Sequence, residues 1–157
     1  MDATKTPNHQ ANELYASLSP QLVALLRECE SEELRKAGTA LIRHGKDLDQ
    51  LVIVCSGQVL ISLPFGGDSV LLGNAGAGKV LGLRALVSGE LPEIDAFCIR
   101  DCAVATISRS RFMELLNKHP EIYSAIAKVL SADLKLAEHH LKNVSRNQAS
   151  RAPKNSC

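Results

Sequence analysis

Glycine residues punctuate a long series of short apolar runs between residues 31 and 108, and this pattern most constrains the fold. The runs include ALIRHG, QLVIVCSG, QVLISL, SVLLG and, further along, IDAFCIRDCAVATIS. Short apolar runs separated by turn residues are typical of strands. The stretch PFGGD, residues 64–68, predicts a hairpin because glycine accepts the positive φ that tight turns need. Many short strands at this spacing predict a sandwich, roll or barrel.

Helical spacing is present on both sides of this region. Leucines recur at helical spacing over residues 11–30, and Pro20 interrupts them, so two short helices are expected there. The stretch SRSRFMELLNKHP predicts another short helix, with Ser108 or Ser110 as its cap. Pro120 then opens a longer helix that is expected to run to about Val144.

The chain of 157 residues fits one domain with extensions. We expect a disordered N-terminus over residues 1–10, a folded domain over 11–144 and a disordered tail over 145–157. Within the domain, strands are expected at about 31–108 and the closing helices at about 109–144. The net charge of +1 argues against a strongly basic surface for DNA or an anionic membrane. Neither a membrane span nor a signal-peptide core is recognisable, so a cytoplasmic location is expected.

Residues suited to metal binding or catalysis are sparse. The five cysteines form no CxxC pair, and three of them, Cys29, Cys55 and Cys98, sit among apolar neighbours as small buried residues do. Cys157 is expected to be exposed. The strand region contains one histidine, His44, whereas metalloenzymes with a similar barrel need clustered histidine and acidic ligands. No catalytic motif is present, so neither a metal site nor an enzyme is expected.

The longer helix carries a heptad-like apolar seam with alternating spacings of four and three. Its members are Tyr123, Ala127, Leu130, Leu134, Ala137, Leu141 and Val144. A second stripe of Ile122, Ile126 and Val129 is expected to pack back onto the strands. The seam predicts a homodimer, and the alternative is a helix that lies wholly on its own domain.

Several stretches in this order resemble the cyclic-nucleotide-binding domain of the Crp/Fnr superfamily. In AGTALIRHGKDLDQLVIVCSGQVLIS, Gly38, Gly45, Ser56 and Gly57 stand where that family places a small residue, a glycine turn and a strand ending in Ser-Gly. GKVLGLRAL, residues 78–86, is similar to the family's Gly-Asp-apolar-Phe-Gly-Glu-apolar-Ala-Leu. Residues 102–134 resemble its last strand, short helix and dimerisation helix. The resemblance spans roughly residues 14–144.

That resemblance implies a mainly β fold, a jelly-roll-like β-roll or double-stranded β-helix of eight strands. Short N-terminal helices would precede the roll, and the long C-terminal dimerisation helix would sense whether a ligand is bound. In transcriptional members a helix-turn-helix follows that helix. About a dozen residues follow Val144, too few for such a module, so direct DNA binding by this chain alone is not expected.

The resemblance also implies a phosphate-binding cassette within residues 82–93. The positions concerned are Gly82, Leu83, Arg84, Ala85, Leu86, Pro92 and Glu93. In the family a Glu after the glycine binds the ribose hydroxyl, and an Arg some nine residues on pairs with the cyclic phosphate. Leu83 occupies the first position, and Pro92 or Glu93 occupies the second. Losing two hydrogen bonds to charged groups weakens binding by about 3–6 kcal/mol.

Two readings of the cassette remain open at this point. Backbone amides at residues 82–85 and the guanidinium of Arg84 could hold an anion, or Arg84 could point to solvent. We therefore expect a regulatory ligand-sensing or interaction module that requires no cofactor and has a protein partner. The alternatives are a functional sensor of cAMP, cGMP or another anion, and the effector domain of a Crp/Fnr transcription regulator.

Overall fold

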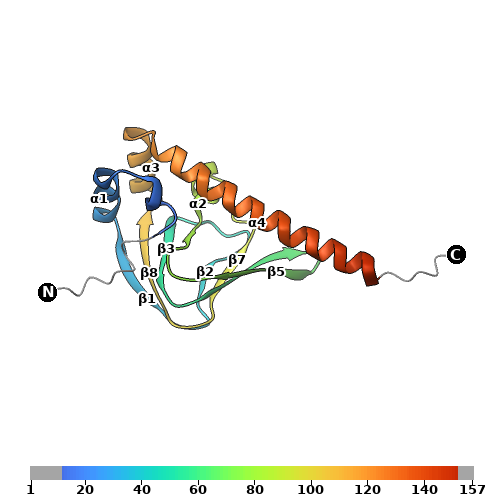
Figure 1. Cartoon of the computed structure of the whole chain (residues 1–157). Helices are drawn as coiled ribbons and strands as arrows, with labels where there is room; N and C mark the ends of the chain where they lie inside the picture. Colours follow the sequence, from blue (N-terminus) through green and yellow to red (C-terminus); the bar gives the residue numbers. More distant parts are fainter. Residues whose placement is uncertain (1–11, 152–157) are drawn as a thin grey trace.

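The structure, a computed structural model, describes the backbone of residues 12–151 and the side chains of residues 12–135, 138, 139 and 142. The predicted disorder of residues 1–10, Cys157 and the end of the tail lie outside the described residues. Figure 1 shows two layers, with all the helices along one side of the strands. The long helix α4 (Ile122–Arg151) crosses this helix layer from end to end and extends beyond it.

Two short helical segments open the described chain, as predicted. Tyr15–Ser17 forms the 3-10 helix η2, and α1 spans Pro20–Glu28. Ser19 caps α1, because its hydroxyl accepts a hydrogen bond from the Leu22 N–H at 3.3 Å. Pro20 occupies the first turn of α1, where its missing N–H leaves no hydrogen bond unmade.

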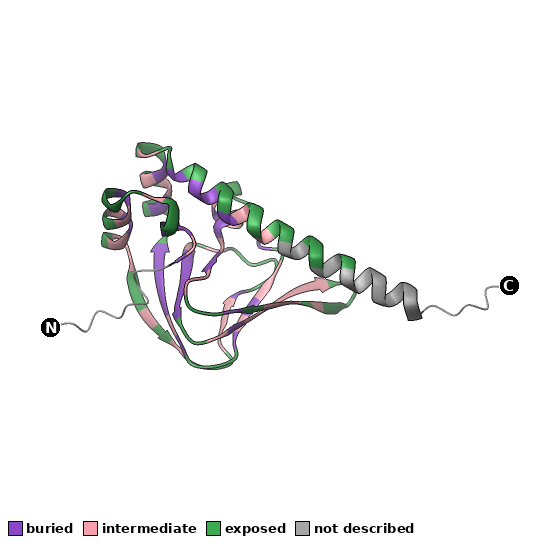
Figure 2. Ribbon diagram, in the orientation of Figure 1, coloured by how far each residue is buried: buried purple, intermediate pink, exposed green. Residues whose placement is uncertain are grey.

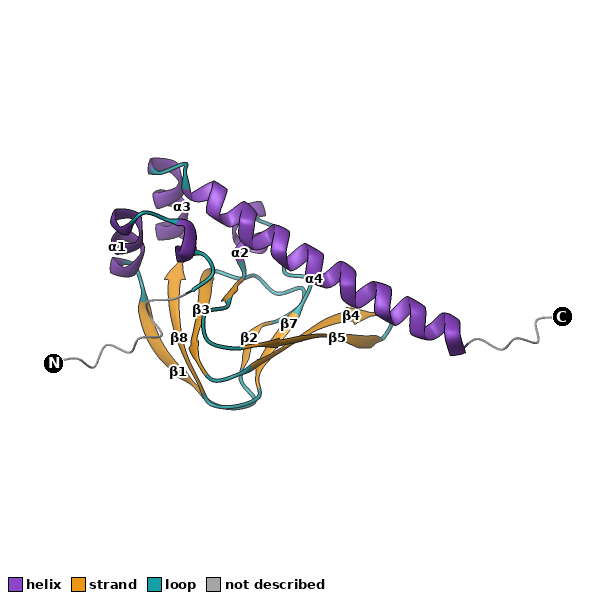
Figure 3. Cartoon of the chain, in the orientation of Figure 1, coloured by secondary structure: helices purple, strands orange, loops and turns teal. Residues whose placement is uncertain are grey.

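Eight strands in the described residues pair antiparallel in two four-stranded sheets, which confirms the predicted β-roll. They are β1 (Ser31–Arg35), β2 (Ala40–Ile42), β3 (Gln50–Ser56), β4 (Val59–Phe65), β5 (Asp68–Ala75), β6 (Val80–Leu81), β7 (Asp95–Cys98) and β8 (Cys102–Ser108). One sheet has the order β1-β8-β3-β6 and the other β2-β7-β4-β5. Figure 3 shows both sheets below the helices.

The hairpin predicted at PFGGD joins β4 to β5. Gly66 and Gly67 both adopt positive φ, at 60° and 88°, which a side chain would oppose. Two strands were not predicted individually, and both lie at an edge of their sheet. β1 is the polar, largely exposed stretch SEELR, and β6 has only two residues, so neither carries an apolar pattern of its own.

The closing helices match the prediction at their beginnings and differ at the end. Ser108 caps α3 (Arg109–Lys118) by accepting from the Arg111 N–H at 3.3 Å. The helix α4 begins after Pro120, as predicted, and continues to Arg151. The expected end near Val144 is therefore wrong, and residues 145–151 extend the helix instead of beginning a disordered tail. The prediction followed the apolar seam, which ends at Val144, and the polar residues after it carry no apolar period that would mark a helix.

Two separate cores hold the layers together, and Figure 2 shows their buried residues on the strands and on the near part of α4. The helix-side core lies between the helices and the β1-β8-β3-β6 sheet and consists of Leu14, Tyr15, Leu22, Leu26, Leu51, Ile53, Cys55, Val80, Leu83, Leu86, Ala105, Ile107, Phe112, Leu116, Ile122, Ala125, Ile126 and Val129. The inter-sheet core consists of Ile42, Val52, Val54, Val59, Ala75, Leu81, Ala96, Cys98, Cys102 and Val104. Strand β3 contributes alternate side chains to each, because successive residues of a strand face opposite sides.

Candidate functional site

The predicted turn and short helix of the cassette are present. Strand β6 ends at Leu81, and Gly82 then caps the helix α2 (Leu83–Ser88) with φ of 93°. A Cβ at Gly82 would lie 2.5 Å from Cδ2 of Leu48, so that side chain would have to move, and the positive φ itself favours glycine. Gly89 closes α2 with φ of 79°. A glycine with positive φ thus stands at each end of α2.

Side chains of the cassette helix serve mainly to pack it. Leu83 and Leu86 are buried in the helix-side core, next to the strands and α4. Leu83 therefore offers no polar group to a ligand, and its burial gives this position a structural role. Ala85 is half-buried and Val87 packs against the same core. Of the residues in α2, Arg84 is the one with a charged side chain.

Arg84 pairs with Glu93 across the mouth of the cassette. Nη1 of Arg84 lies 3.1 Å from Oε1 of Glu93, and the two side chains are 67% and 65% exposed. Of the two readings of Arg84, the structure therefore places its side chain at the surface, with a carboxylate from its own chain as partner. Pro92, the other candidate for the family's Arg position, is buried, and its carbonyl accepts from the Gly45 N–H at 3.0 Å.

Asp95, the first residue of β7, is a second acidic residue close to the cassette in the sequence. Oδ1 of Asp95 accepts a hydrogen bond from the backbone N–H of His44 at 2.8 Å, which ties β7 to the turn after β2. On that turn the guanidinium of Arg43 lies 5.7 Å from the centre of the Phe97 ring. Asp95 and Arg43 are thus engaged with the roll itself.

The cysteines of the described chain are free thiols, and three of them, Cys55, Cys98 and Cys102, are buried, whereas Cys29 is half-buried. Burial raises the pKa of the Cys55 and Cys98 thiols to about 11 in each case. The Cys102 thiol donates to the carbonyl of Arg100 at 3.3 Å. These residues behave as small buried side chains. In the described part of the chain no three His, Cys, Asp or Glu side chains are grouped to hold a metal ion.

The long helix presents two different faces. Its predicted inner stripe, Ile122, Ile126 and Val129, is buried against the roll. Of the predicted seam, Tyr123 is 42% exposed, Leu134 is 60% exposed, Ala127 is exposed and Leu130 is half-buried. The side chains of Ala137, Leu141 and Val144 lie outside the described residues. The seam residues whose side chains are described therefore lie beside the buried face of α4, and the domain covers them only in part.

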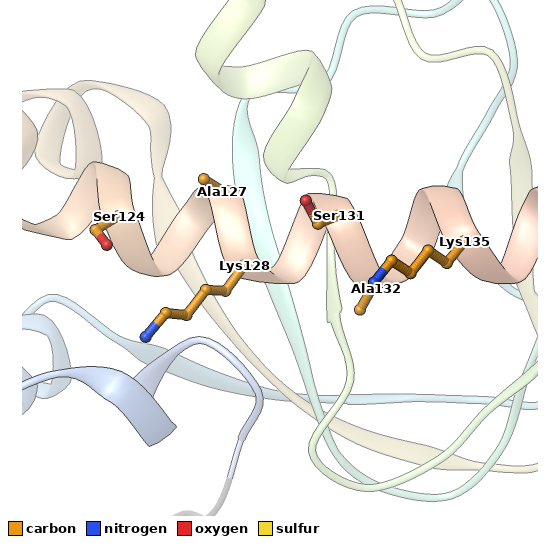
Figure 4. A pocket seen from close by; sticks show the side chains of 6 residues that line it. All are labelled: Ser124, Ala127, Lys128, Ser131, Ala132 and Lys135. Carbon is orange, nitrogen blue, oxygen red and sulfur yellow. The ribbon is translucent and has the colours of Figure 1, made fainter.

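A shallow depression of about 440 Å³ adjoins this seam on the outer side of α4. Its lining residues are Ser124, Ala127, Lys128, Ser131, Ala132 and Lys135. Figure 4 shows Lys128 extending away from the helix and Lys135 lying back along it toward Ala132. The lining side chains of this face are small apart from the two lysines.

One cluster of charged side chains was not predicted from the sequence. Nζ of Lys79 lies 2.5 Å from Oδ1 of Asp133 and 3.5 Å from Oε2 of Glu13. These residues come from the turn before β6, from α4 and from the N-terminal segment. Because the partners are far apart in the sequence, no local motif signals the cluster.

No helix in the described part of the chain combines the length and the apolarity needed to cross a membrane. The fold is a β-roll: two antiparallel sheets, a glycine-capped turn and helix between β6 and β7, and a long helix packed on one sheet. The chain belongs to the cyclic nucleotide-binding domain family, whose match covers residues 33–119, more than half of its length.

Similar proteins include both transcriptional and kinase-linked members. The catabolite activator protein of Thermus thermophilus has 23% sequence identity and a TM-score of 0.73, over 85% of this chain and 63% of that one. The regulatory domain of Toxoplasma gondii PKA, crystallised with cAMP, has 25% identity and a TM-score of 0.62, over 66% of this chain and 40% of that one. Lysophospholipase nte1 of Aspergillus fumigatus is 26% identical over 117 residues, which are 72% of this chain and 8% of that protein. The chain thus spans less than two thirds of each.

Proposed function

We propose that this chain is a regulatory interaction module of the cyclic nucleotide-binding type, with a cassette that no longer holds a cyclic nucleotide tightly. The observation that carries this proposal is the Arg84–Glu93 ion pair, together with the burial of Leu83. Both positions where the family places its ligand-binding Glu and Arg have other uses here. A carboxylate at the mouth of the cassette repels a phosphate, and the nearest cation already has a partner.

The energetic consequence follows from the missing contacts. Two absent hydrogen bonds to charged groups correspond to about 3–6 kcal/mol of lost binding free energy. That is a weakening of about 10²- to 10⁴-fold. Backbone amides next to Gly82 would contribute some anion binding, but an exposed Arg84 adds little to it because solvent screens its charge.

Homodimerisation through α4 is the second part of the proposal. Leu134 and Tyr123 are exposed apolar side chains on the seam, and the adjoining face is low and lined by small residues. Burying a large aliphatic side chain contributes about 1.5–3 kcal/mol, and association costs about 4–15 kcal/mol. A seam repeated on two chains therefore supports a dimer of moderate affinity.

The module would act by coupling the conformation of the cassette to the position of α4 in the dimer. Leu83 and Leu86 of α2 share the helix-side core with Ile126 and Val129 of α4. A shift of α2 would displace α4 through the side chains packed between them. A partner protein that binds one arrangement of the two helices more tightly would increase the population of that arrangement. The free thiols in the described chain suit a reducing compartment such as the cytoplasm, where we expect the module to act. The net charge of +1 gives no electrostatic basis for DNA binding.

Thermal unfolding with and without millimolar cAMP, cGMP or cyclic dinucleotides tests the first part. We expect no shift of the midpoint, whereas a ligand at about 100 times its dissociation constant would stabilise by about 2.7 kcal/mol, or several degrees. A shift that Arg84→Ala abolishes would contradict the proposal and assign a working anion sensor. The cAMP-bound relative from Toxoplasma gondii keeps that alternative open for direct measurement.

Sedimentation equilibrium tests the second part. Leu134→Lys should shift the chain from dimer toward monomer, because a buried charge without a partner opposes association. Leu34→Lys is the matched control, since Leu34 is 86% exposed on β1, away from α4. Equal dimer content in both variants would refute the α4 interface.

A further inference from the structure

Lys79 joins three segments that are distant in the sequence. It stands directly before β6, and its ammonium group contacts Asp133 of α4 at 2.5 Å and Glu13 of the N-terminal segment at 3.5 Å. The side chains of Lys79 and Glu13 are 23% and 28% exposed, and that of Asp133 is 39% exposed. Partly buried pairs are less screened by solvent than a fully exposed pair such as Arg84–Glu93.

The backbone around Lys79 is held from both sides. Oε2 of Glu13 accepts from the Val80 N–H at 2.7 Å, and the Glu13 N–H donates to the carbonyl of Gly78 at 2.9 Å. On the other side, the Val54 N–H donates to the carbonyl of Lys79 at 2.9 Å. Any displacement of Lys79 is therefore passed to Val80, which lies two residues before the capping glycine of α2.

Asp133 lies one turn after Val129, the last buried residue of α4 among the side chains that the structure describes. Val129, one turn earlier, is buried in the helix-side core, whereas Leu134, the next residue, is exposed on the seam. Figure 1 shows α4 continuing beyond the helix layer past this region. A rotation of α4 that repositions Leu134 must also move Asp133, and Asp133 is paired with the residue that anchors β6.

The charges within the cluster make Lys79 its central member. Burial raises the pKa of Glu13, and the negative charge of Asp133 raises it further, while the Val80 N–H and Lys79 lower it. Without the ammonium group two carboxylates would face each other in a partly buried site. Removing Lys79 therefore converts an attraction between α4 and the N-terminal segment into a repulsion.

We propose that the Glu13–Lys79–Asp133 cluster couples the position of α4 to the conformation of the cassette, with Lys79 as the positioning residue. The coupling rests on the proposed function in one respect, that α4 and the cassette act as parts of one regulatory module. It adds the residues that connect them. Asp133 moves with α4, its ion pair transmits the movement to Lys79, and β6 connects Lys79 to Gly82. The N-terminal segment fixes the same point through Glu13.

Amide hydrogen exchange on the full chain tests this coupling. Asp133→Asn keeps the size of the side chain and removes its charge, and Lys79→Met keeps the alkyl stem. We expect each variant to raise exchange in α2, residues 83–88, by about three- to tenfold, although Asp133 lies on another element. Lys79→Arg should keep exchange within about twofold of the wild type, because the cation is retained.

Two internal references separate coupling from general destabilisation. Amides of β8 should be unchanged, since that strand lies inside its sheet between β1 and β3 and does not pair with β6. Lys118→Met removes an exposed pair with Glu114, at 3.9 Å, and should leave α2 unchanged. If Asp133→Asn changes exchange only within α4, or raises it equally everywhere, the coupling is refuted. The measurement needs neither ligand nor dimer, so its failure is distinct from failure of the proposed function.

Discussion

The two cores of the molecule differ in the size of the side chains that fill them. The helix-side core contains most of the largest fully buried residues, including Phe112, Leu14, Leu26 and Leu51. The inter-sheet core is built from valines, alanines and two cysteines, with Ile42 and Leu81 as its larger members. Because apolar burial scales with buried area, more of the stabilisation arises on the helix side.

The cassette belongs mainly to the first of these cores. Leu83 and Leu86 anchor α2 among the helices, while only Leu81 of the preceding strand faces the space between the sheets. A change in the cassette therefore acts directly on the helix layer, without having to deform the roll. In this chain the cassette helix is therefore packed as part of the helix layer rather than as part of the roll.

The largest expected effect tests this difference between the cores. Phe112→Ala should reduce the free energy of unfolding by about 3–5 kcal/mol, because it leaves a cavity beneath α3. Val54→Ala, at a fully buried inter-sheet site, should cost about 1.5–3 kcal/mol. Urea unfolding monitored by circular dichroism measures both. Equal costs would contradict the view that the helix side dominates.

A glycine at the crossing between the sheets offers the next largest effect. Gly57 has φ of 100°, and a Cβ there would lie 2.6 Å from the Asp101 carbonyl oxygen and 2.6 Å from the Cys102 sulfur. Gly45 also has positive φ, at 76°, but its Cβ would have no neighbour within 4 Å. Gly57→Ala should therefore destabilise by about 1–3 kcal/mol more than Gly45→Ala.

That difference isolates crowding from backbone strain, because the two glycines share the left-handed conformation. Gly57 connects β3 of one sheet to β4 of the other, so its crowding measures how closely the sheets are joined at this corner. If both variants unfold at the same urea concentration, the corner adapts to a side chain, and the inter-sheet core is looser than its packing indicates.

The order of elements could be predicted because it depends on local patterns. Glycine turns, alternating apolar residues and the caps Ser19 and Ser108 are each contained in a few consecutive residues. The edge strand β1 was not predicted, because its exposed residues carry no apolar period. The end of α4 was placed too early, because the apolar seam stops before the helix does. Resemblance to the family supplied the eight-strand roll, which local patterns alone left among several architectures.

The candidate site was predictable in backbone and not in contacts. The sequence indicated a turn and helix at Gly82 and the absence of the usual ligand-binding side chains. It left the direction of Arg84 open, because its pairing with Glu93 depends on the loop that brings the two ends of the cassette together. The Lys79 cluster depends on α4 passing over the turn before β6, which is a tertiary fact with no local signal.

The pH dependence of the free energy of unfolding tests the environment of Glu13, in the N-terminal segment beside the helix-side core. The folded-state pKa of Glu13 is raised above its ordinary value by burial, in a site that Lys79, Asp133 and the Val80 N–H face. A raised carboxyl pKa contributes stability at low pH that is lost as the pH rises through the folded value. From about pH 4 to about pH 7 the wild type should therefore lose more stability than Glu13→Gln.

Urea midpoints for the two proteins across this range provide the measurement, and only their difference matters because other carboxylates titrate in both. Glu13→Gln keeps an oxygen that can accept from the Val80 N–H, so its effect reports charge more than lost hydrogen bonding. Parallel curves would mean that Lys79 fully compensates the burial of the Glu13 carboxylate, so that ionisation of Glu13 does not change the free energy of unfolding.

The smallest expected effect concerns the Arg84–Glu93 pair, and its smallness is informative. Both side chains are about two-thirds exposed, so a double-mutant cycle of Arg84→Ala and Glu93→Ala should give a coupling of about 0.2–1 kcal/mol that salt reduces. A pair of this strength contributes little to the stability of the fold. A coupling free energy well above this range would mean that the pair contributes substantially to the stability of the fold, in addition to the helix-side core.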